Sequence, residues 1–203
     1  MKKLSFLASL VVVCLPLAAS AQEVAPRAEI FGGYSFLRID LGAVPAGAVP
    51  AGTIPGNLDT HGFNVSLAAN PARHVGIISE FSHYTKTESF NILGSPLPGG
   101  VNIDFRVLTL LFGPRVTLHR GKVEPFVHAL FGAARADASS LGMSLGDPGY
   151  AFAYALGGGF DVKVHNNFAI RLGQVDYLEA RSGGEGLKNF RYSVGVVIRL
   201  GNR

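Results

Sequence analysis

Residues 150–164 read YAFAYALGGGFDVKV and alternate between two kinds of side chain. Large apolar residues, such as Phe152 and Leu156, occupy nearly every second position, and only Gly158 in that series is small. The positions between them hold alanine, glycine and the charged residues Asp161 and Lys163. Successive side chains of a β-strand point to opposite faces, so this pattern predicts a strand with one bulky apolar face and one small or charged face.

The same alternation recurs along the chain. Of its 203 residues, 26 are glycine, 48% are hydrophobic and 16% are charged, a composition that favours strands and turns. Eight strand-like segments are predicted, at about 27–38, 60–70, 74–86, 103–119, 123–136, 149–164, 167–180 and 189–200. Short connections at 70–74, 119–123 and 165–167 alternate with long ones at 39–59, 87–102, 137–148 and 181–188. This alternation is typical of an antiparallel up-and-down barrel with tight turns at one end and long loops at the other.

The N-terminal segment, residues 1–21, has a basic start, an apolar run over 4–17 and the small residues Ala19-Ser20-Ala21. These features predict a secretory signal peptide with cleavage before Gln22, the alternative being an uncleaved anchor. Cys14 lies inside the apolar run, so the barrel domain, residues 22–203, contains no cysteine for a disulfide. Loss of Lys2 and Lys3 reduces the formal charge from +4 to +2, which gives no support for nucleic-acid binding.

The volumes of the two faces indicate which one lies inside. A secreted lipocalin-like barrel would hold the bulky residues in its narrow interior and the charges outside. Small residues, however, fit the crowded interior of a closed eight-stranded barrel, whereas bulky apolar ones have unlimited room outside. The bulky face is therefore predicted to contact lipid, which makes the fold an all-β, eight-stranded antiparallel transmembrane β-barrel. The residues predicted to face lipid are Phe63, Val65, Leu67, Phe152, Tyr154, Leu156, Phe160, Val162, Val194, Val196 and Ile198.

Several segments resemble a known family. GPR at 113–115 before a short turn, PFVHALFGAA at 125–134, GGGFDV at 157–162 and IRLGQVDYL at 170–178 look like the outer-membrane β-barrel domain family. That family is similar to the OmpA transmembrane domain, OmpX and the opacity proteins. The resemblance covers roughly 27–201, and its motifs are architectural, so it implies the fold rather than an activity. Chains of this kind often end in an aromatic residue that the barrel insertion machinery reads, whereas this chain ends LGNR at 200–203.

Charged residues on the small-residue face are predicted to lie inside the barrel, and they are Glu80, Arg115, Glu124, His128, Asp161, Lys163, Arg171 and Arg199. An eight-stranded barrel is just wide enough for side chains to fill, and an isolated buried ion costs several kcal/mol. We therefore predict a network of ion pairs that fills the lumen, with a narrow ion path as the alternative. Arg115 is expected to pair with an acidic residue such as Glu80 or Asp161.

No catalytic, cofactor-binding or metal site is predicted. Ser82 and His83 are adjacent and so point to opposite faces of a strand, which excludes a nucleophile–base pair between them. The histidines near strand ends are too scattered in sequence for a metal site, and the glycines at 157–159 lie within a strand rather than before a helix. Candidates for an interfacial aromatic belt are Tyr34, Tyr84, Tyr150, Tyr154, Tyr177 and Tyr192.

The sequence thus predicts an integral outer-membrane β-barrel protein of a Gram-negative cell envelope. Its expected role is structural or surface-interactive, through four long external loops, and it is not expected to be a wide pore or an enzyme. The alternatives are passage of small apolar molecules across the outer membrane and a lipid-modifying barrel enzyme. The expected partners are outer-membrane lipid, the barrel insertion machinery and an unidentified extracellular ligand on the loops, with no nucleic acid.

Overall fold

The computed structural model describes residues 25–40, 57–90, 101–119, 121–140, 143–144, 150–182 and 185–202. The predicted signal peptide and most of the first long loop lie outside these residues. The strands are β1 Pro26–Asp40, β2 Asn57–Ala69, β3 Val75–Phe90, β4 Val101–Thr117, β5 Val123–Ser140, β6 Met143–Ser144, β7 Tyr150–His165, β8 Phe168–Ser182 and β9 Glu185–Asn202. The eight long strands confirm the predicted series.

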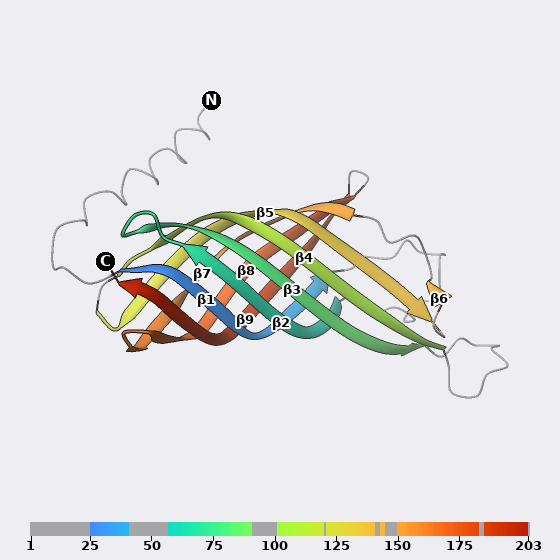
Figure 1. Cartoon of the computed structure of the whole chain (residues 1–203). Coiled ribbons are helices and arrows are strands. Elements are labelled where there is room, and N and C mark those ends of the chain that lie inside the picture. Colours follow the sequence, from blue (N-terminus) through green and yellow to red (C-terminus); the bar gives the residue numbers. More distant parts are fainter. Residues whose placement is uncertain are drawn as a thin grey trace, which may run out of the picture.

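These eight strands form one closed antiparallel barrel (Figure 1). Each pairs with its neighbours in the chain, with β7 following β5 in the wall, and pairing of β1 with β9 closes the ring. The strand register, followed once around the wall from Ala28, returns to β1 at Arg38, a stagger of ten residues. Such a stagger requires strands that are tilted relative to the barrel axis. The predicted all-β barrel fold is confirmed.

Within the described residues, the structure contains no helix long and apolar enough to span a membrane.

The outer face of the wall carries an uncharged band. Its large apolar side chains are well exposed, for example Leu110 at 59%, Phe112 at 63% and Val127 at 61%. The small residues between the bulky ones point inward, and Ala153 and Ala155 are completely buried. An outward apolar band about 25 Å tall is what surrounds a barrel in the hydrocarbon core of a membrane. We call this feature the apolar band.

The apolar band ends at charged residues toward the end of the barrel where the long connections lie. We call this the loop end, and the opposite end, where the short connections, the start of β1 and the end of β9 lie, the turn end. The first charged outward-facing residues at the loop end are Arg38 on β1, Asp59 on β2, Arg106 on β4, Arg135 on β5 and Glu179 on β8. Because charged side chains are costly in hydrocarbon, the wall above this level projects beyond the apolar phase.

The predicted loop boundaries are wrong at two places. The connection expected at 181–188 is a tight hairpin, because β8 and β9 pair up to Ser182 opposite Glu185. Only Gly183 and Gly184 separate them, and two glycines suit a two-residue hairpin loop. The connection expected at 87–102 is also shorter, because β3 and β4 pair as far as Phe90 and Val101. The barrel therefore has three long connections at the loop end rather than four.

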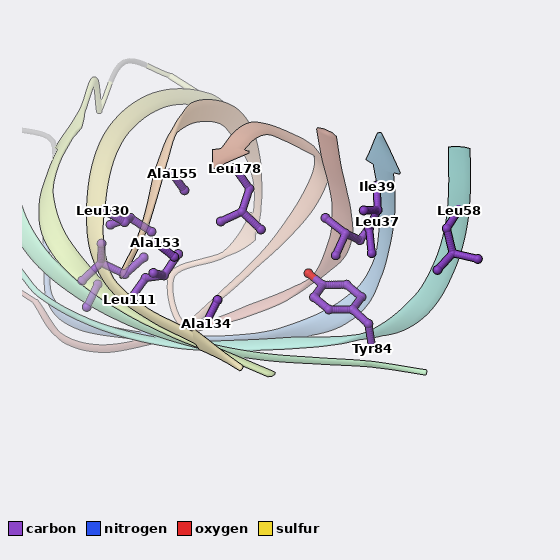
Figure 2. Close-up of a cluster of buried hydrophobic side chains, with 12 residues drawn as sticks. Leu37, Ile39, Leu58, Tyr84, Leu111, Leu130, Ala134, Ala153, Ala155 and Leu178 are labelled. Atoms are coloured by element: carbon purple, nitrogen blue, oxygen red, sulfur yellow. The ribbon is translucent and has the colours of Figure 1, made fainter. Parts of the chain in front are cut away.

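The interior contains an apolar cluster and a polar zone. Buried apolar side chains from seven strands form the cluster (Figure 2), most of which lies toward the loop end, and its large members are Leu37, Ile39, Leu58, Ile78, Tyr84, Leu111, Leu130 and Leu178. The Tyr84 hydroxyl hydrogen-bonds Ser35 at 2.9 Å, and Ser35 hydrogen-bonds Ser193 at 2.8 Å. These hydroxyls mark the transition to the second, polar zone. Tyr84 therefore lies inside the barrel and not in the aromatic belt for which it was a candidate.

Candidate functional site

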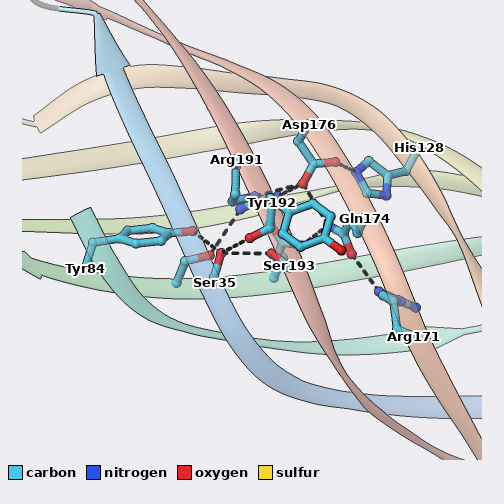
Figure 3. Close-up of polar contacts among 11 residues, drawn as sticks. Ser35, Tyr84, His128, Arg171, Gln174, Asp176, Arg191, Tyr192 and Ser193 are labelled. Carbon is cyan, nitrogen blue, oxygen red and sulfur yellow. Dashed lines mark hydrogen bonds and ion pairs between the residues drawn. The ribbon is translucent and has the colours of Figure 1, made fainter. Parts of the chain in front are cut away.

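The polar zone of the lumen is centred on Arg191 of β9 (Figure 3). This fully buried guanidinium lies 2.5 Å from a carboxylate oxygen of Glu80 and 2.6 Å from one of Asp176. It also donates a hydrogen bond of 3.1 Å to the hydroxyl of Ser82. On its other side, the Asp176 carboxylate contacts Nε2 of His128 at 2.7 Å. One arginine thus links strands β3, β8 and β9, and His128 adds β5.

Gln174 connects this centre to a second ion pair. Its amide nitrogen donates to Asp176 at 2.8 Å and to Glu80 at 3.3 Å, while its amide oxygen accepts from Arg171 at 2.7 Å. Arg171 in turn forms a two-point ion pair with Asp161, at 2.8 and 3.0 Å. Two parallel N–H···O bonds of this kind are the strongest common geometry for a guanidinium and a carboxylate.

A bulge in β8 makes the position of Gln174 possible. The register between β8 and β9 shifts between Arg171 and Gln174, so that two residues of β8 lie opposite one of β9. Arg171 and Gln174 consequently both point inward although they are three residues apart, and both are buried. The bulge also shifts the alternation of the sequence, so that Leu172 and Val175, three residues apart, both point outward.

Two further ion pairs lie toward the turn end. Arg115 of β4 pairs with Glu29 of β1, and Arg199 of β9 pairs with Glu124 of β5. The guanidinium of Arg171 lies between two aromatic rings, 4.3 Å from the ring centre of Phe31 and 4.2 Å from that of Phe126. Such stacking stabilises a cation that has been removed from water.

We call this whole set the plug, and its charged or amide-bearing members are Glu29, Glu80, Arg115, Glu124, His128, Asp161, Arg171, Gln174, Asp176, Arg191 and Arg199. Several of its ion pairs join strands that are not neighbours in the wall, for instance β9 with β3 and β9 with β5. Bonds of this kind cross the lumen. A buried charge without a partner costs several kcal/mol, so these side chains stabilise the barrel only while they remain paired.

Seven of the eight residues predicted to face the lumen are buried in the plug, with Lys163 as the exception. Lys163 is half-buried near the short turn between β7 and β8, and it lines a surface depression with Lys122 and His165. In the part of the chain that the structure describes, it makes no ion pair. The reason is its position, two residues before the end of β7, where water reaches the side chain.

The partner expected for Arg115 is also corrected. The sequence left Glu80 and Asp161 open, but Arg115 contacts Glu29, whereas Glu80 pairs with Arg191 and Asp161 with Arg171. Sequence reasoning missed four members of the plug, namely Glu29, Gln174, Asp176 and Arg191. A signal existed for Arg191, because it shares the inward alternation of its strand with Arg199.

Two histidines that are distant in sequence meet at the turn end. The rings of His74 and His119 lie 6.0 Å apart, and Nδ1 of His74 is 3.0 Å from the carbonyl oxygen of Thr117. Burial lowers the pKa of His119 to about 4, so this imidazole is neutral at neutral pH. Among the described residues, no group of three or more metal-ligating side chains is placed to hold a metal ion.

The geometry offers no nucleophile for an enzyme of the serine–histidine type at the position considered. Ser82 points inward, is completely buried and accepts its hydrogen bond from Arg191. His83 points to the outer face, where its ring lies 5.7 Å from that of Phe63. Glu80 is occupied by the ion pair with Arg191.

Comparisons with known proteins place the chain among outer-membrane barrels. The model of the family described as "Outer membrane protein beta-barrel domain" matches residues 5–199. Among solved structures, the chain is similar to Ail, the attachment invasion locus protein of Yersinia pestis, in complex with the heparin analogue sucrose octasulfate, at 19% identity and a TM-score of 0.57. That match covers 87% of this chain and 99% of Ail. Neisserial surface protein A is 10% identical with a TM-score of 0.59, over 88% of this chain and 100% of the other. A comparison with curated protein sequences gives no significant match.

Proposed function

Because the chain belongs to the outer membrane protein beta-barrel domain family, we propose that it serves at the cell surface, where it binds an extracellular partner through its loop end. In barrels of this class, short turns face the periplasm and long connections face the outside, so the loop end is the external one. The barrel itself would act as a rigid support in the outer membrane and not as a wide pore or an enzyme.

The observation that carries this proposal is the plug. Its ion pairs cross the lumen between Arg191 and Glu80 and between Arg199 and Glu124. Wide passage of solutes would require these buried pairs to break, at a cost of about 3–5 kcal/mol for each carboxylate left unpaired. With the lumen crossed in this way, the part of the molecule available for interaction is the projecting wall and the connections at the loop end.

The names of two similar structures agree with a surface role. One is an attachment protein determined with a sulfated glycan analogue, and the other is named a surface protein. At these identities the likeness carries the fold and not the ligand, so a sulfated glycan is only one candidate partner to be tried.

The test is adhesion of cells that display the protein. Cells of a Gram-negative host expressing the wild type should bind immobilised matrix proteins or heparin more strongly than cells carrying the empty vector. Replacement of 41–56 by a short glycine-serine linker should reduce binding, whereas Lys122→Ser at the turn end should not. Equal adhesion of cells with the wild type and cells with the empty vector on every surface would contradict the proposal, provided that the wild-type barrel is folded in the outer membrane.

A second function, passage of small apolar molecules, is favoured by one observation. The loop-end half of the lumen is lined by apolar side chains, including Leu37, Leu111 and Leu178. An apolar molecule that entered there would meet the charged plug below it. Uptake of a radiolabelled alkane into liposomes that contain the purified barrel would separate this function from the surface role, which predicts no uptake above that of protein-free liposomes.

A further inference from the structure

The turn end of the barrel carries charges of one sign outside the plug. Its described segments are 25–28, 69–75, 118–119, 121–123, 163–168 and 199–202. Their basic side chains outside the plug are Arg27, Arg73, His74, His119, Lys122, Lys163 and His165. These segments contain no aspartate or glutamate. At the loop end, by contrast, outward arginines are matched by acids, as in the pair of Arg38 with Asp59. We call the set of turn-end cations the basic rim.

The apolar band extends as far as the basic rim. The outward side chains next to the turns are large and apolar, and Leu118, Val123 and Val164 are 46%, 51% and 64% exposed. Charged side chains on a barrel are tolerated only where the hydrocarbon ends. The basic rim therefore lies at the level of the lipid headgroups. Because short turns face the periplasm in barrels of this class, these headgroups belong to the periplasmic leaflet.

Two neighbouring turns bring Lys122 and Lys163 together. β5 pairs with β7 from Val123 opposite Val162, and the backbone N–H of Lys163 donates a hydrogen bond of 2.8 Å to the carbonyl oxygen of Lys122. The turn between β4 and β5 consequently lies beside the turn between β7 and β8 (Figure 1). Gly121 has a φ of 74°, a left-handed conformation that glycine adopts without strain, and this permits the tight turn into Lys122.

A surface depression of about 410 Å³ lies between these two turns. It is lined by Gly121, Lys122, Lys163, Val164, His165 and Asn166. Lys122 is exposed and Lys163 is half-buried, and neither forms an ion pair within the described segments. Nδ1 of His165 accepts a hydrogen bond of 3.4 Å from the backbone N–H of Asn167, which leaves Nε2 as a donor. The depression thus offers two ammonium groups, an imidazole N–H and a side-chain amide, and its lining holds no carboxylate.

From these observations we propose that the depression binds the phosphate of an anionic phospholipid of the periplasmic leaflet, of the phosphatidylglycerol class. A phosphate diester supplies the negative charge and the acceptor oxygens that the depression lacks, and lysine binds phosphate as a point charge. Two ammonium groups without a counter-charge repel each other, and a bound anion removes that repulsion.

The apolar band identifies the anion as a lipid. Val164 belongs both to the lining of the depression and to the outward apolar side chains, and Val123 begins the neighbouring strand. A phosphate bound at Lys122 and Lys163 would therefore have its acyl chains on the apolar band. The ammonium group of a zwitterionic lipid would be repelled by the same lysines, which favours an anionic headgroup. The inference goes beyond the surface role, because it concerns the opposite end of the barrel.

The experiment uses the barrel purified in detergent from the outer membrane of a Gram-negative host. Native mass spectrometry measures its binding of phosphatidylglycerol and of phosphatidylcholine with the same acyl chains. Each lysine near a headgroup should contribute about fivefold, so we expect a preference for phosphatidylglycerol of about 25-fold. Lys122→Gln with Lys163→Gln should remove most of this preference. Lys122→Arg with Lys163→Arg should keep it, because both charges are retained.

The matched control removes the same charge at the other end. Arg106→Gln with Arg135→Gln changes two outward arginines of the loop end and should leave the preference unchanged. Gel mobility establishes that each variant is folded before the titration. In nanodiscs, phosphatidylglycerol should slow hydrogen exchange of the amides of residues 165–167 relative to phosphatidylcholine. This slowing should be absent from the variant without Lys122 and Lys163.

Four results would overturn the inference. Equal affinity for the two lipids would mean that the charge of the headgroup is not recognised. A preference that survives Lys122→Gln with Lys163→Gln would place the anion elsewhere, and an equal loss in the loop-end control would reduce the effect to net charge. Displacement of the lipid by equimolar glycerol phosphate or by a soluble glutamate-rich peptide would identify a site for soluble anions. None of these measurements involves the loop end, so their outcome is separate from that of the adhesion assay.

Discussion

Replacement of Arg191 by methionine should destabilise the barrel more than any other single substitution in the plug. The change removes the guanidinium and keeps most of the volume of the side chain. Glu80 then loses an ion pair of 2.5 Å and keeps the hydrogen bond from the Gln174 amide at 3.3 Å. The Asp176 carboxylate is less affected, because it retains its contacts with His128 at 2.7 Å and Gln174 at 2.8 Å.

The magnitude follows from this difference. One well-buried carboxylate is left without a cation, and breaking a buried pair by removing one partner costs about 3–5 kcal/mol. We therefore expect the free energy of unfolding to fall by about 3–5 kcal/mol. Adding Glu80→Gln to Arg191→Met should recover about 1–3 kcal/mol, because no lone carboxylate remains at that position.

Urea unfolding in phospholipid vesicles measures the effect. The chain has no tryptophan, so folding is followed by circular dichroism and by the gel mobility of the folded barrel. Arg181→Met is the control, since Arg181 is a surface arginine with a side chain 60% exposed, and its pair with Glu179 should contribute no more than about 1 kcal/mol. The reasoning is refuted if Arg191→Met and Arg181→Met unfold at the same urea concentration with the same slope.

Three further outcomes are expected. Leu156→Arg on the apolar band should lower the free energy of unfolding in vesicles by about 2–4 kcal/mol, whereas Thr85→Arg near the loop end should lower it by about 1 kcal/mol or less. Equal folding yields of the two variants would contradict the assignment of the outer face to lipid. Arg115→Ala should be milder than Arg191→Met, because Glu29 keeps a second guanidinium, that of Arg199, at 4.0 Å; a double-mutant cycle with Glu29→Gln measures this coupling. The pKa of His119 falls from 6.5 to about 4 on folding, so between these pH values the unfolded chain binds more protons than the folded one. The free energy of unfolding should therefore decline as the pH drops through that range. The decline should be smaller for His119→Gln in the same urea series, and parallel curves for the wild type and the variant would exclude the effect.

The fold could be predicted because the side chains of the barrel wall alternate with a period of two. Lipid surrounds the barrel and its lumen is narrow, so bulky residues occupy the outer face and small residues the inner face. Residues 150–164 show this directly, since Phe152 is 56% exposed while Ala153 is completely buried. The ends of the strands were less predictable. Thr87, Glu88 and Ser89 are polar and were expected in the connection at 87–102, yet they belong to β3 and pair with β4, because a strand beyond the apolar band can carry polar residues on either face.

The plug could be predicted only in part, because alternation says which residues point inward but not which strands face one another. The partnership of Arg115 and Glu29 joins residues 86 positions apart and depends on the stagger of the whole barrel. Glu29 was missed because Phe31 and Leu37, which share its inward face, are large and apolar, so the two faces of β1 do not differ clearly in size. Asp176 was missed because the β8 bulge changes the phase of the strand just before it.

The β8 bulge also determines where the wall can change in length. At most positions of a strand, loss of a single residue turns every later side chain to the opposite face, which here would place charges in lipid. Between Arg171 and Gln174, β8 holds one residue more than β9 requires. Deletion of Gly173 would therefore leave Val175 outside and Asp176 inside, as they are now. Relatives of this barrel that are one residue shorter should carry their gap at this point of β8, and an alignment that places the gap elsewhere in the strand would misassign the inner and outer faces.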